Sequence, residues 1–389
     1  MRQFDFTRLP GVNDDAMQAT VDAARRMPDV FWGVGAHPRY PGAWVLTRHD
    51  LLREVLQDPE TFSSRDVSGL SGLAGESWPL LPLEADGPDH AEWRKLLVPI
   101  FSPARMTAME VQIENLARDL VEGLASRGEA EFMADFAQVF PVQIFLGMFG
   151  LPLELTNQFV AWEEKLLHSE SIDEKCGAAR AIINYLREAI ADRLQSPRDD
   201  LISYIAHAQV KGAELTDDQR IGLCMLLYTA GIDTVANMLG FMFRHLAENP
   251  DKQQRLREDP SLIPAAVEEM LRAFPIVMTS RLVTKDVDFH GVTMKAGDCV
   301  SVPTHFAGRD GHEFPDPDHI DFSRAKVTHI TFAAGPHRCL GSHLARRELK
   351  VALETWLNRV PEFRLVPGRQ IKSSAFGVLA IEALPLAWR

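Results

Sequence analysis

Cys339 lies in a loop that contains Gly335, Pro336 and Gly341 and that precedes a long amphipathic stretch. A cysteine at the start of a helix faces amide N–H groups and the positive end of the helix dipole. These stabilise its thiolate, which can then bind a metal. A soft thiolate suits iron. The alternative is that Cys339 is a small buried hydrophobic residue, as many free cysteines are. Taken alone, this cysteine is compatible with both interpretations.

The residues around Cys339 help to decide between a metal ligand and a buried hydrophobic residue. They follow the spacing Phe-x-x-Gly-x-His-x-Cys-x-Gly, formed by Phe332, Gly335, His337, Cys339 and Gly341. The pattern resembles the haem-binding loop of the cytochrome P-450 monooxygenases. The resemblance implies that Cys339 is the iron ligand of haem b and that Phe332, His337 and Gly341 help to bind this cofactor. Ala333 stands where the family usually has a glycine, so the turn must form without the most permissive residue.

A second group of chemically active residues interrupts the apolar segment from Ile221 to Leu246. Read alone, Thr234 bonds back to the carbonyl of Ala230, and Asp233 reaches solvent or an ion pair. The segment Ala230-Gly231-Ile232-Asp233-Thr234 also resembles the central-helix signature of the same family. That resemblance implies that Gly231 lets the helix open to oxygen, that Thr234 hydrogen-bonds to oxygen bound at the iron, and that Asp233 relays protons. Asp233 and Thr234 are therefore the predicted catalytic pair.

His90 and Arg94 are spaced by one helical turn and share a face, where both could meet an anion or simply be solvated. In the family this motif faces the haem propionates, and Arg281 and His337 match two further positions with that role. The resemblance therefore implies that four groups from distant parts of the chain bind the two propionate carboxylates.

Glu269 and Arg272 have the spacing of an ordinary surface ion pair on a helix. Arg324, which lies shortly before the cysteine loop, resembles the second arginine of the family's buried Glu-Arg-Arg network. The resemblance implies a structural network that braces the side of the haem on which Cys339 lies.

The resemblance is strongest to the bacterial camphor hydroxylase and its relatives, and it implies an apolar substrate pocket. Each pocket position would separately pass as core packing. Trp78 stands where the camphor enzyme has a tyrosine, and its indole N–H donates from a different point. The implied substrate is a small terpenoid or norisoprenoid, either a monoterpenoid or an ionone-like molecule. The implied pocket residues are Trp78, Leu80, Leu83, Leu226, Thr229, Ala230, Val277, Thr279 and Val378.

Most of the chain has the 3.6-residue apolar period of helices, with Pro and Gly at the joints. Thr216 and Gln219 predict a capping box at the start of the longest helix. We expect a mainly α fold, the cytochrome P-450 fold, with small sheets beside a helical bundle and the haem between the long central helix and the cysteine loop. The predicted helices are Asp14–Met27, His49–Gln57, His90–Phe101, Pro103–Ser126, Ala134–Phe149, Leu153–His168, Ile172–Leu194 and Asp199–Ala208. The predicted strands are Ala43–Thr47, Arg281–Val287, Asp298–Val302 and Val378–Ala383.

Composition limits the possible classes of function. The 389 residues are 46% hydrophobic and 8% aromatic, and we expect one large domain over residues 1–389. The net charge of −13 argues against nucleic-acid binding. The four dispersed cysteines suggest neither disulfides nor a zinc site. The sequence shows no signal peptide and no uncharged apolar span long enough for a membrane, so a cytoplasmic protein is expected.

The predicted activity is hydroxylation by a haem-thiolate monooxygenase that uses O2. The chain has no flavin or nicotinamide domain, so the resemblance implies a two-iron two-sulfur ferredoxin and an NADH-dependent ferredoxin reductase. A cluster of basic residues suits an acidic electron donor or is a solvated face. One alternative is a peroxide-driven hydroxylase, and another is a non-catalytic haem-based sensor or terpenoid-binding protein. The basic residues are Arg94, Lys95, Arg105, Arg338, Arg346, Arg347 and Lys350.

Overall fold

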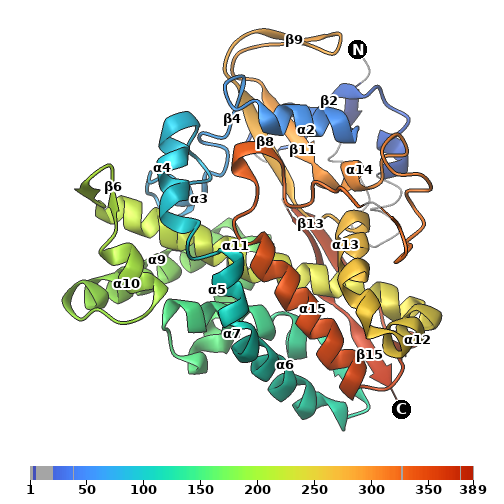
Figure 1. The fold of residues 1–389 in the computed structure, drawn as a ribbon. Helices are drawn as coiled ribbons and strands as arrows, with labels where there is room; N and C mark the ends of the chain where they lie inside the picture. Colours follow the sequence, from blue (N-terminus) through green and yellow to red (C-terminus); the bar gives the residue numbers. More distant parts are fainter. Residues whose placement is uncertain (1–2, 6–20, 38, 326, 377, 389) are drawn as a thin grey trace.

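The computed structural model describes residues 3–5, 21–37, 39–325, 327–376 and 378–388. Helices make up most of it, and Figure 1 shows them grouped beside a sheet that includes β2, β8 and β11. The α-helices are α2 (His49–Gln57), α3 (Leu70–Leu73), α4 (Gly87–Leu97), α5 (Pro103–Ala108), α6 (Glu110–Ala125), α7 (Val139–Phe149), α8 (Thr156–Glu163), α9 (Ile172–Gln195), α10 (Leu201–Ala206), α11 (Asp217–Glu248), α12 (Pro250–Glu258), α13 (Ile263–Ala273), α14 (Thr304–Gly308) and α15 (Ser342–Arg359).

Short strands form small sheets within the described residues. The largest sheet has the order β1-β2-β3-β11-β8-β4, a second has the order β12-β15-β5, and β9-β10, β13-β14 and β6-β7 form pairs. The strands are β1 (Gln3–Asp5), β2 (Val30–Val34), β3 (Gly42–Leu46), β4 (Phe62–Ser63), β5 (Glu129–Glu131), β6 (Gln209–Val210), β7 (Ala213–Glu214), β8 (Met278–Val283), β9 (Val287–Phe289), β10 (Val292–Met294), β11 (Cys299–Pro303), β12 (Phe363–Leu365), β13 (Lys372–Phe376), β14 (Val378–Ala383) and β15 (Pro385–Trp388).

The predicted mainly α architecture with small sheets is thus observed, with differences at several boundaries. The predicted helix 103–126 divides at Met109 into α5 and α6. The predicted helices 134–149 and 153–168 each contain a π-helical segment, η2 (Met133–Ala137) and η4 (Glu164–His168). The predicted helix Asp14–Met27 lies partly outside the described residues. Within its described part, residues 21–24 are helical.

The long helix α11 organises the core. Its N-terminus has the predicted capping box, in which the Thr216 hydroxyl accepts from Gln219 N and the Gln219 side chain accepts from Thr216 N. Residues of its first half, up to Ile232, belong to one large apolar cluster, and residues from Val235 onwards belong to another. Asp233 and Thr234 therefore lie at the junction of the two clusters.

The length and apolar composition of α11 would also allow it to cross a membrane. However, 67% of its most apolar window is buried inside the protein. A helix that is apolar on all sides and surrounded by protein is a core helix. In Figure 1 it crosses the middle of the molecule behind α15, with which it is in contact.

Candidate active site

The loop that carries Cys339 is held by its own backbone. Cys339 N donates to Phe332 O at 2.9 Å. Ala333 has a φ of +58°, which is the left-handed conformation that favours glycine. Gly335 also has a positive φ, and a Cβ there would lie 2.5 Å from Leu56 O. The loop therefore needs Gly335 for space, and it adopts the conformation of a glycine at Ala333 without having one.

The thiol of Cys339 is accessible although it lies deep in the protein. Burial raises the pKa of the Cys339 thiol, and the Gly341 N–H with the charges of Arg94, Arg346 and Arg338 only partly opposes this effect. The sequence-based expectation of a readily ionised thiol is therefore wrong for the polypeptide alone, because desolvation outweighs the helix start. A coordinated metal ion deprotonates such a thiol directly.

Histidines from two separate segments meet beside this loop. The rings of His90 on α4 and His337 in the loop lie 4.1 Å apart between centroids. Arg94, one turn further along α4, donates to Arg338 O at 2.7 Å. The structure thus brings α4 against the cysteine loop, as the propionate-binding prediction requires.

This region has positive potential and few acidic partners. Burial, with the charges of Arg281 and His90, lowers the pKa of His337 to about 3. Burial lowers the pKa of Arg281 to about 10. Asp86, which the sequence analysis missed, is the nearest carboxylate, and its Oδ1 lies 3.6 Å from His337 Nε2.

Several donors of this region have no acceptor. The Nε2 atoms of His90 and His337 are buried and unpartnered within the described part of the chain. Arg281 on β8 is 3% exposed and donates only to Thr279 Oγ1 and Ser280 O among the described residues. Unpaired buried donors and cations are costly. A ligand that carries two carboxylates fits these donors, as haem b does.

The middle of α11 presents an accessible side within a buried helix. Ala230 is exposed and Leu226, Thr229 and Thr234 are half-buried, whereas most of their neighbours on α11 are buried. The Thr234 hydroxyl donates to Ala230 O at 2.9 Å. The helix continues without a break through Gly231. Leu226 on this side of α11 and Leu340, which follows Cys339, both pack against the same apolar cluster.

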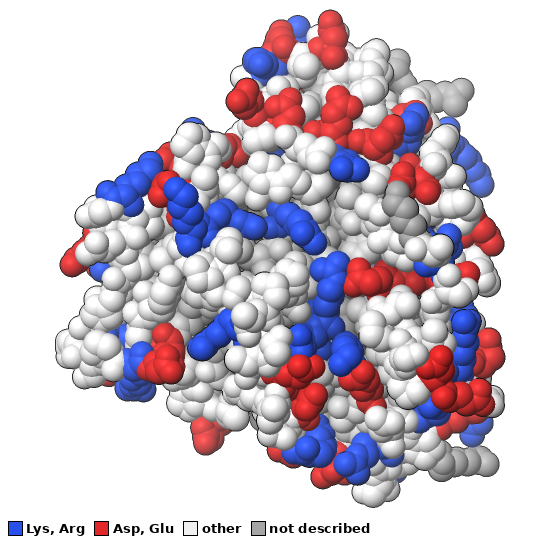
Figure 2. Space-filling model, in the orientation of Figure 1, with Lys and Arg blue, Asp and Glu red and all other residues white. Residues whose placement is uncertain are grey.

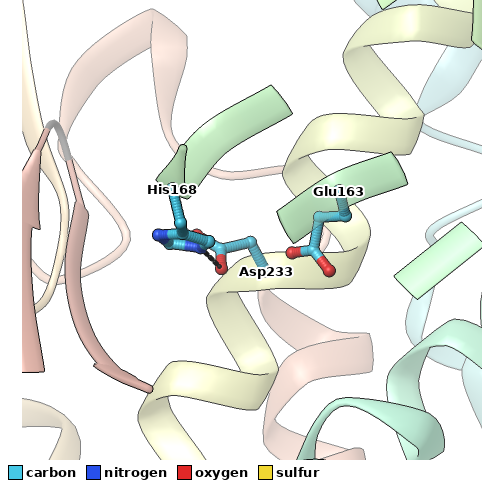
Figure 3. Close-up of side chains that lie close together, drawn as sticks. All are labelled: Glu163, His168 and Asp233. Atoms are coloured by element: carbon cyan, nitrogen blue, oxygen red, sulfur yellow. Dashed lines mark hydrogen bonds and ion pairs between the residues drawn. The ribbon is translucent and has the colours of Figure 1, made fainter. Parts of the chain in front are cut away.

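Asp233 points to a different set of partners. Its Oδ1 lies 2.9 Å from His168 Nε2 and accepts from Asn237 Nδ2 at 2.6 Å. The carboxyl group of Glu163 completes a cluster in which the candidate ligand atoms of Glu163, His168 and Asp233 lie within 4.8 Å of one another (Figure 3). No sequence motif indicated Glu163, His168 or Asn237. Only the i, i+4 spacing of Asp233 and Asn237 on a predicted helix could have indicated one of these contacts.

The predicted pocket residues differ in how they are placed. Trp78 and Leu80 are buried. The Trp78 indole N–H donates to Glu76 Oε2 at 2.6 Å, so this donor is already engaged. Ala230 is exposed, the other predicted positions are half-buried, and Val277 pairs with Val378 in a β-bridge. These half-buried positions are Leu83, Leu226, Thr229, Val277, Thr279 and Val378.

Glu269, Arg272 and Arg324 come together as one network. Arg272 Nη2 donates to Glu269 Oε1 at 2.8 Å and its Nε to Oε2 at 2.9 Å. Arg324 Nε reaches Glu269 Oε2 at 3.1 Å, and Asp321 N donates to Glu269 Oε1. Glu269 and Arg272 are fully buried, with 0% of either side chain exposed. Every oxygen of the buried carboxylate is therefore hydrogen-bonded.

Comparisons with known proteins agree with this arrangement. The family model described as Cytochrome P-450 matches residues 165–385. The chain is 37% identical over 393 residues to a probable cytochrome P-450 127A1 of Sinorhizobium fredii, covering 100% of this chain and 94% of that protein. Among solved structures, cytochrome P-450 CYP101C1 is similar, with a TM-score of 0.88, 35% identity and coverage of 99% of this chain and 96% of the other. A mutant of EryK in complex with erythromycin B has a TM-score of 0.87, 30% identity and coverage of 97% and 98%.

Proposed function

Because the chain belongs to the cytochrome P-450 family of haem-thiolate monooxygenases, we propose that it hydroxylates a small apolar terpenoid or norisoprenoid with O2 and electrons from a ferredoxin. Haem b supplies the oxidising centre that inserts an oxygen atom of O2 into a C–H bond. In this proposal Cys339 is the axial ligand, and His90, Arg94, Arg281 and His337 bind the propionates. The unpartnered donors of this group support the assignment.

In this proposal, Asp233 and Thr234 transfer protons. Thr234 lies on the accessible side of α11, where its hydroxyl can hydrogen-bond to a ligand when it releases Ala230 O. Asp233, the preceding residue, is 4% exposed, and its carboxylate contacts His168 and Asn237. A carboxyl group beside a hydroxyl can move protons by general acid–base steps.

One observation carries the proposed substrate class: the polar side chains at the pocket positions are all engaged within the protein. Thr229 Oγ1 donates to Met225 O at 2.9 Å, and Thr279 Oγ1 accepts from Arg281 Nη1 at 3.1 Å. The indole N–H of Trp78 is bonded to Glu76. What the lining offers a ligand is therefore mainly apolar surface, which suits a hydrocarbon-like molecule with few polar groups.

Titration of the ferric protein with a ligand panel tests this class. Substrates that enter the pocket change the spin state and hence the absorption spectrum of the haem. We expect monoterpenoids and ionones to produce this change and to yield hydroxylated products. A response to a macrolide such as erythromycin B and to no terpenoid would overturn the proposed class.

The ferredoxin proposal rests on the basic residues around the cysteine loop. Figure 2 shows Lys and Arg side chains gathered near the start of α15, with acidic side chains at the border. Some are neutralised, since Arg346 pairs with Glu268 and Arg347 with Glu110. Within the described residues, Arg105 and Arg338 make no ion pair, whereas Arg94 is assigned to the propionates. Their charge supports docking of an acidic partner.

Charge reversal tests the docking surface. Lys95→Glu and Arg105→Glu should slow reduction by an acidic ferredoxin, and the difference from wild type should shrink at high salt because salt screens exposed charges. Arg180→Glu on α9 makes the same charge change away from the patch and serves as the control. Equal reduction rates for all variants would overturn this docking surface.

A further inference from the structure

Three titratable side chains meet at the midpoint of α11. Figure 3 shows His168 and Glu163 on opposite sides of the Asp233 carboxylate. His168 Nε2 is 2.9 Å from Asp233 Oδ1, while Asp233 Oδ2 is buried and has no hydrogen-bond partner within the described part of the chain. The Glu163 carboxyl points towards Asp233, so a proton on Glu163 would supply the missing donor.

The π-helical segment η4 creates this arrangement. Ser169 N bonds to Glu164 O, the i→i+5 bond of a π-turn. Glu163 and His168 are five residues apart, and in an α-helix such side chains would diverge. The wider turn lets both approach the same carboxylate. Asn237 holds that carboxylate from the other direction and is itself anchored, because its Oδ1 accepts from Ile381 N.

The surrounding charges fix the protonation states. Burial and the neighbouring charge of Asp233 raise the pKa of Glu163 well above its usual value, which favours its protonated form. Burial lowers the pKa of His168, but the hydrogen bond and charge of Asp233, with the charges of Glu164 and Glu382, outweigh burial and raise it. Lys175 on α9 is the basic residue near this cluster, and its Nζ donates a hydrogen bond to Leu167 O.

The cluster also connects the interior with solvent. The side chain of His168 is 12% exposed and that of Asp233 is 5% exposed. Glu164 and Glu382 are exposed, and their charges act on His168. His168 therefore lies between exposed carboxylates and the buried acid that precedes Thr234.

We propose that His168 is the proton-relay residue through which solvent protons reach Asp233, and that Glu163 is a neutral acid that holds Asp233 in place for this transfer. The proposal rests on the proposed function, since it supplies the protons that Asp233 and Thr234 deliver. In the step, the Nε2–H bond of the His168 imidazolium breaks and an O–H bond forms on Asp233. This leaves a neutral carboxylic acid and a neutral imidazole that keeps its Nδ1–H. When the ring turns Nε2 towards solvent, Nε2 takes up a solvent proton, and the return of the ring to Asp233, which has by then passed its proton on, resets the pair.

Two substitutions at His168 distinguish a role in proton transfer from a role of its positive charge. His168→Gln keeps a donor towards Asp233 but cannot titrate, and His168→Arg keeps the positive charge but does not release a proton at neutral pH. We expect both to lower product formation about tenfold or more, as loss of a general acid does. Wild-type turnover should fall as pH rises through the elevated pKa of His168, whereas the variants should lack this step and show a larger solvent deuterium isotope effect.

His290→Gln is the matched control, because it breaks another histidine–carboxylate pair, His290 with Glu54, at the surface. It should retain the wild-type rate and pH profile. Wild-type turnover together with an unchanged pH profile and isotope effect in His168→Gln would overturn the relay alone. Restoration of the wild-type rate by His168→Arg would also overturn it. A wild-type chain that forms no product overturns the proposed function and the relay with it.

A spectroscopic measurement tests the protonation states without turnover. The NMR titration of His168 in the haem-loaded, carbon monoxide-bound protein should shift to lower pH in Asp233→Asn and stay near the wild-type value in Glu163→Gln. If Glu163→Gln lowered it as much as Asp233→Asn, Glu163 would be an anion and its assigned role would be wrong.

Discussion

The Cys339 loop and the middle of α11 differ in how far along the chain their partners lie. The loop closes on itself, with Cys339 N bonded to Phe332 O and Arg338 N to Gly335 O. Asp233 on α11 instead meets His168, 65 residues away, and Asn237 is anchored to Ile381, 144 residues away. The loop encodes its own geometry and can be recognised as a motif, whereas no local pattern connects Asp233 with His168.

The largest effect is expected when Cys339, the central residue of the loop, is replaced. Cys339→Ser replaces the thiol with a hydroxyl, which is a far poorer iron ligand. We expect complete loss of the red-shifted absorption band that family members show in the reduced, carbon monoxide-bound form. Cys176→Ser, on α9, should retain the band. Persistence of the band in Cys339→Ser would show that another residue binds the iron.

The next effect concerns the network that braces the loop side. Glu269→Ala leaves Arg272 buried at 0% exposure without its carboxylate. Breaking a buried ion pair in this way costs about 3–5 kcal/mol. Urea unfolding and haem retention measure the loss. Glu122→Ala, which removes an exposed ion pair with Arg359, should cost only about 0–1 kcal/mol. Equal stability of the two variants would contradict a structural role for Glu269.

On the α11 side, we expect defects in chemistry rather than in folding. Thr234→Ala removes a hydroxyl that bonds, among the described residues, to Ala230 O alone, so stability should change little. Hydroxylated product per NADH should fall about tenfold or more, with the lost electrons appearing as peroxide. The carbon monoxide band should persist. Full coupling in Thr234→Ala would refute the proton-delivery assignment.

The smallest effect is expected at Ala333, the strained position of the loop. Ala333→Gly should stabilise the protein by about 1 kcal/mol or less, because relief of the left-handed alanine is offset by the greater freedom of glycine in the unfolded chain. Ala334→Gly is the control. Its φ of −135° suits alanine, so this substitution should destabilise the protein by about 0.4–1 kcal/mol. Thermal unfolding compares the two, and destabilisation by both would contradict strain at Ala333.

Local patterns in the sequence predicted many features of this protein. It predicted the family, the mainly α fold, the capping box of α11 and helix α2 (His49–Gln57), since these features depend on local spacing and periodicity. It also indicated which residues of the cysteine loop and of the Glu269 network to examine. At Ala333 the motif indicated a turn without its usual glycine, and the left-handed φ of +58° was found only in the structure.

Other features became visible only when separate segments of the chain were seen packed together. Burial, which the sequence does not display, raises the pKa of Cys339 where the helix start alone predicts a lower one. The indole of Trp78 turned out to be bonded to Glu76. The π-turn at Glu164–His168 brought two residues with no motif of their own to Asp233. Such contacts depend on how separate segments pack, and no local pattern records that packing.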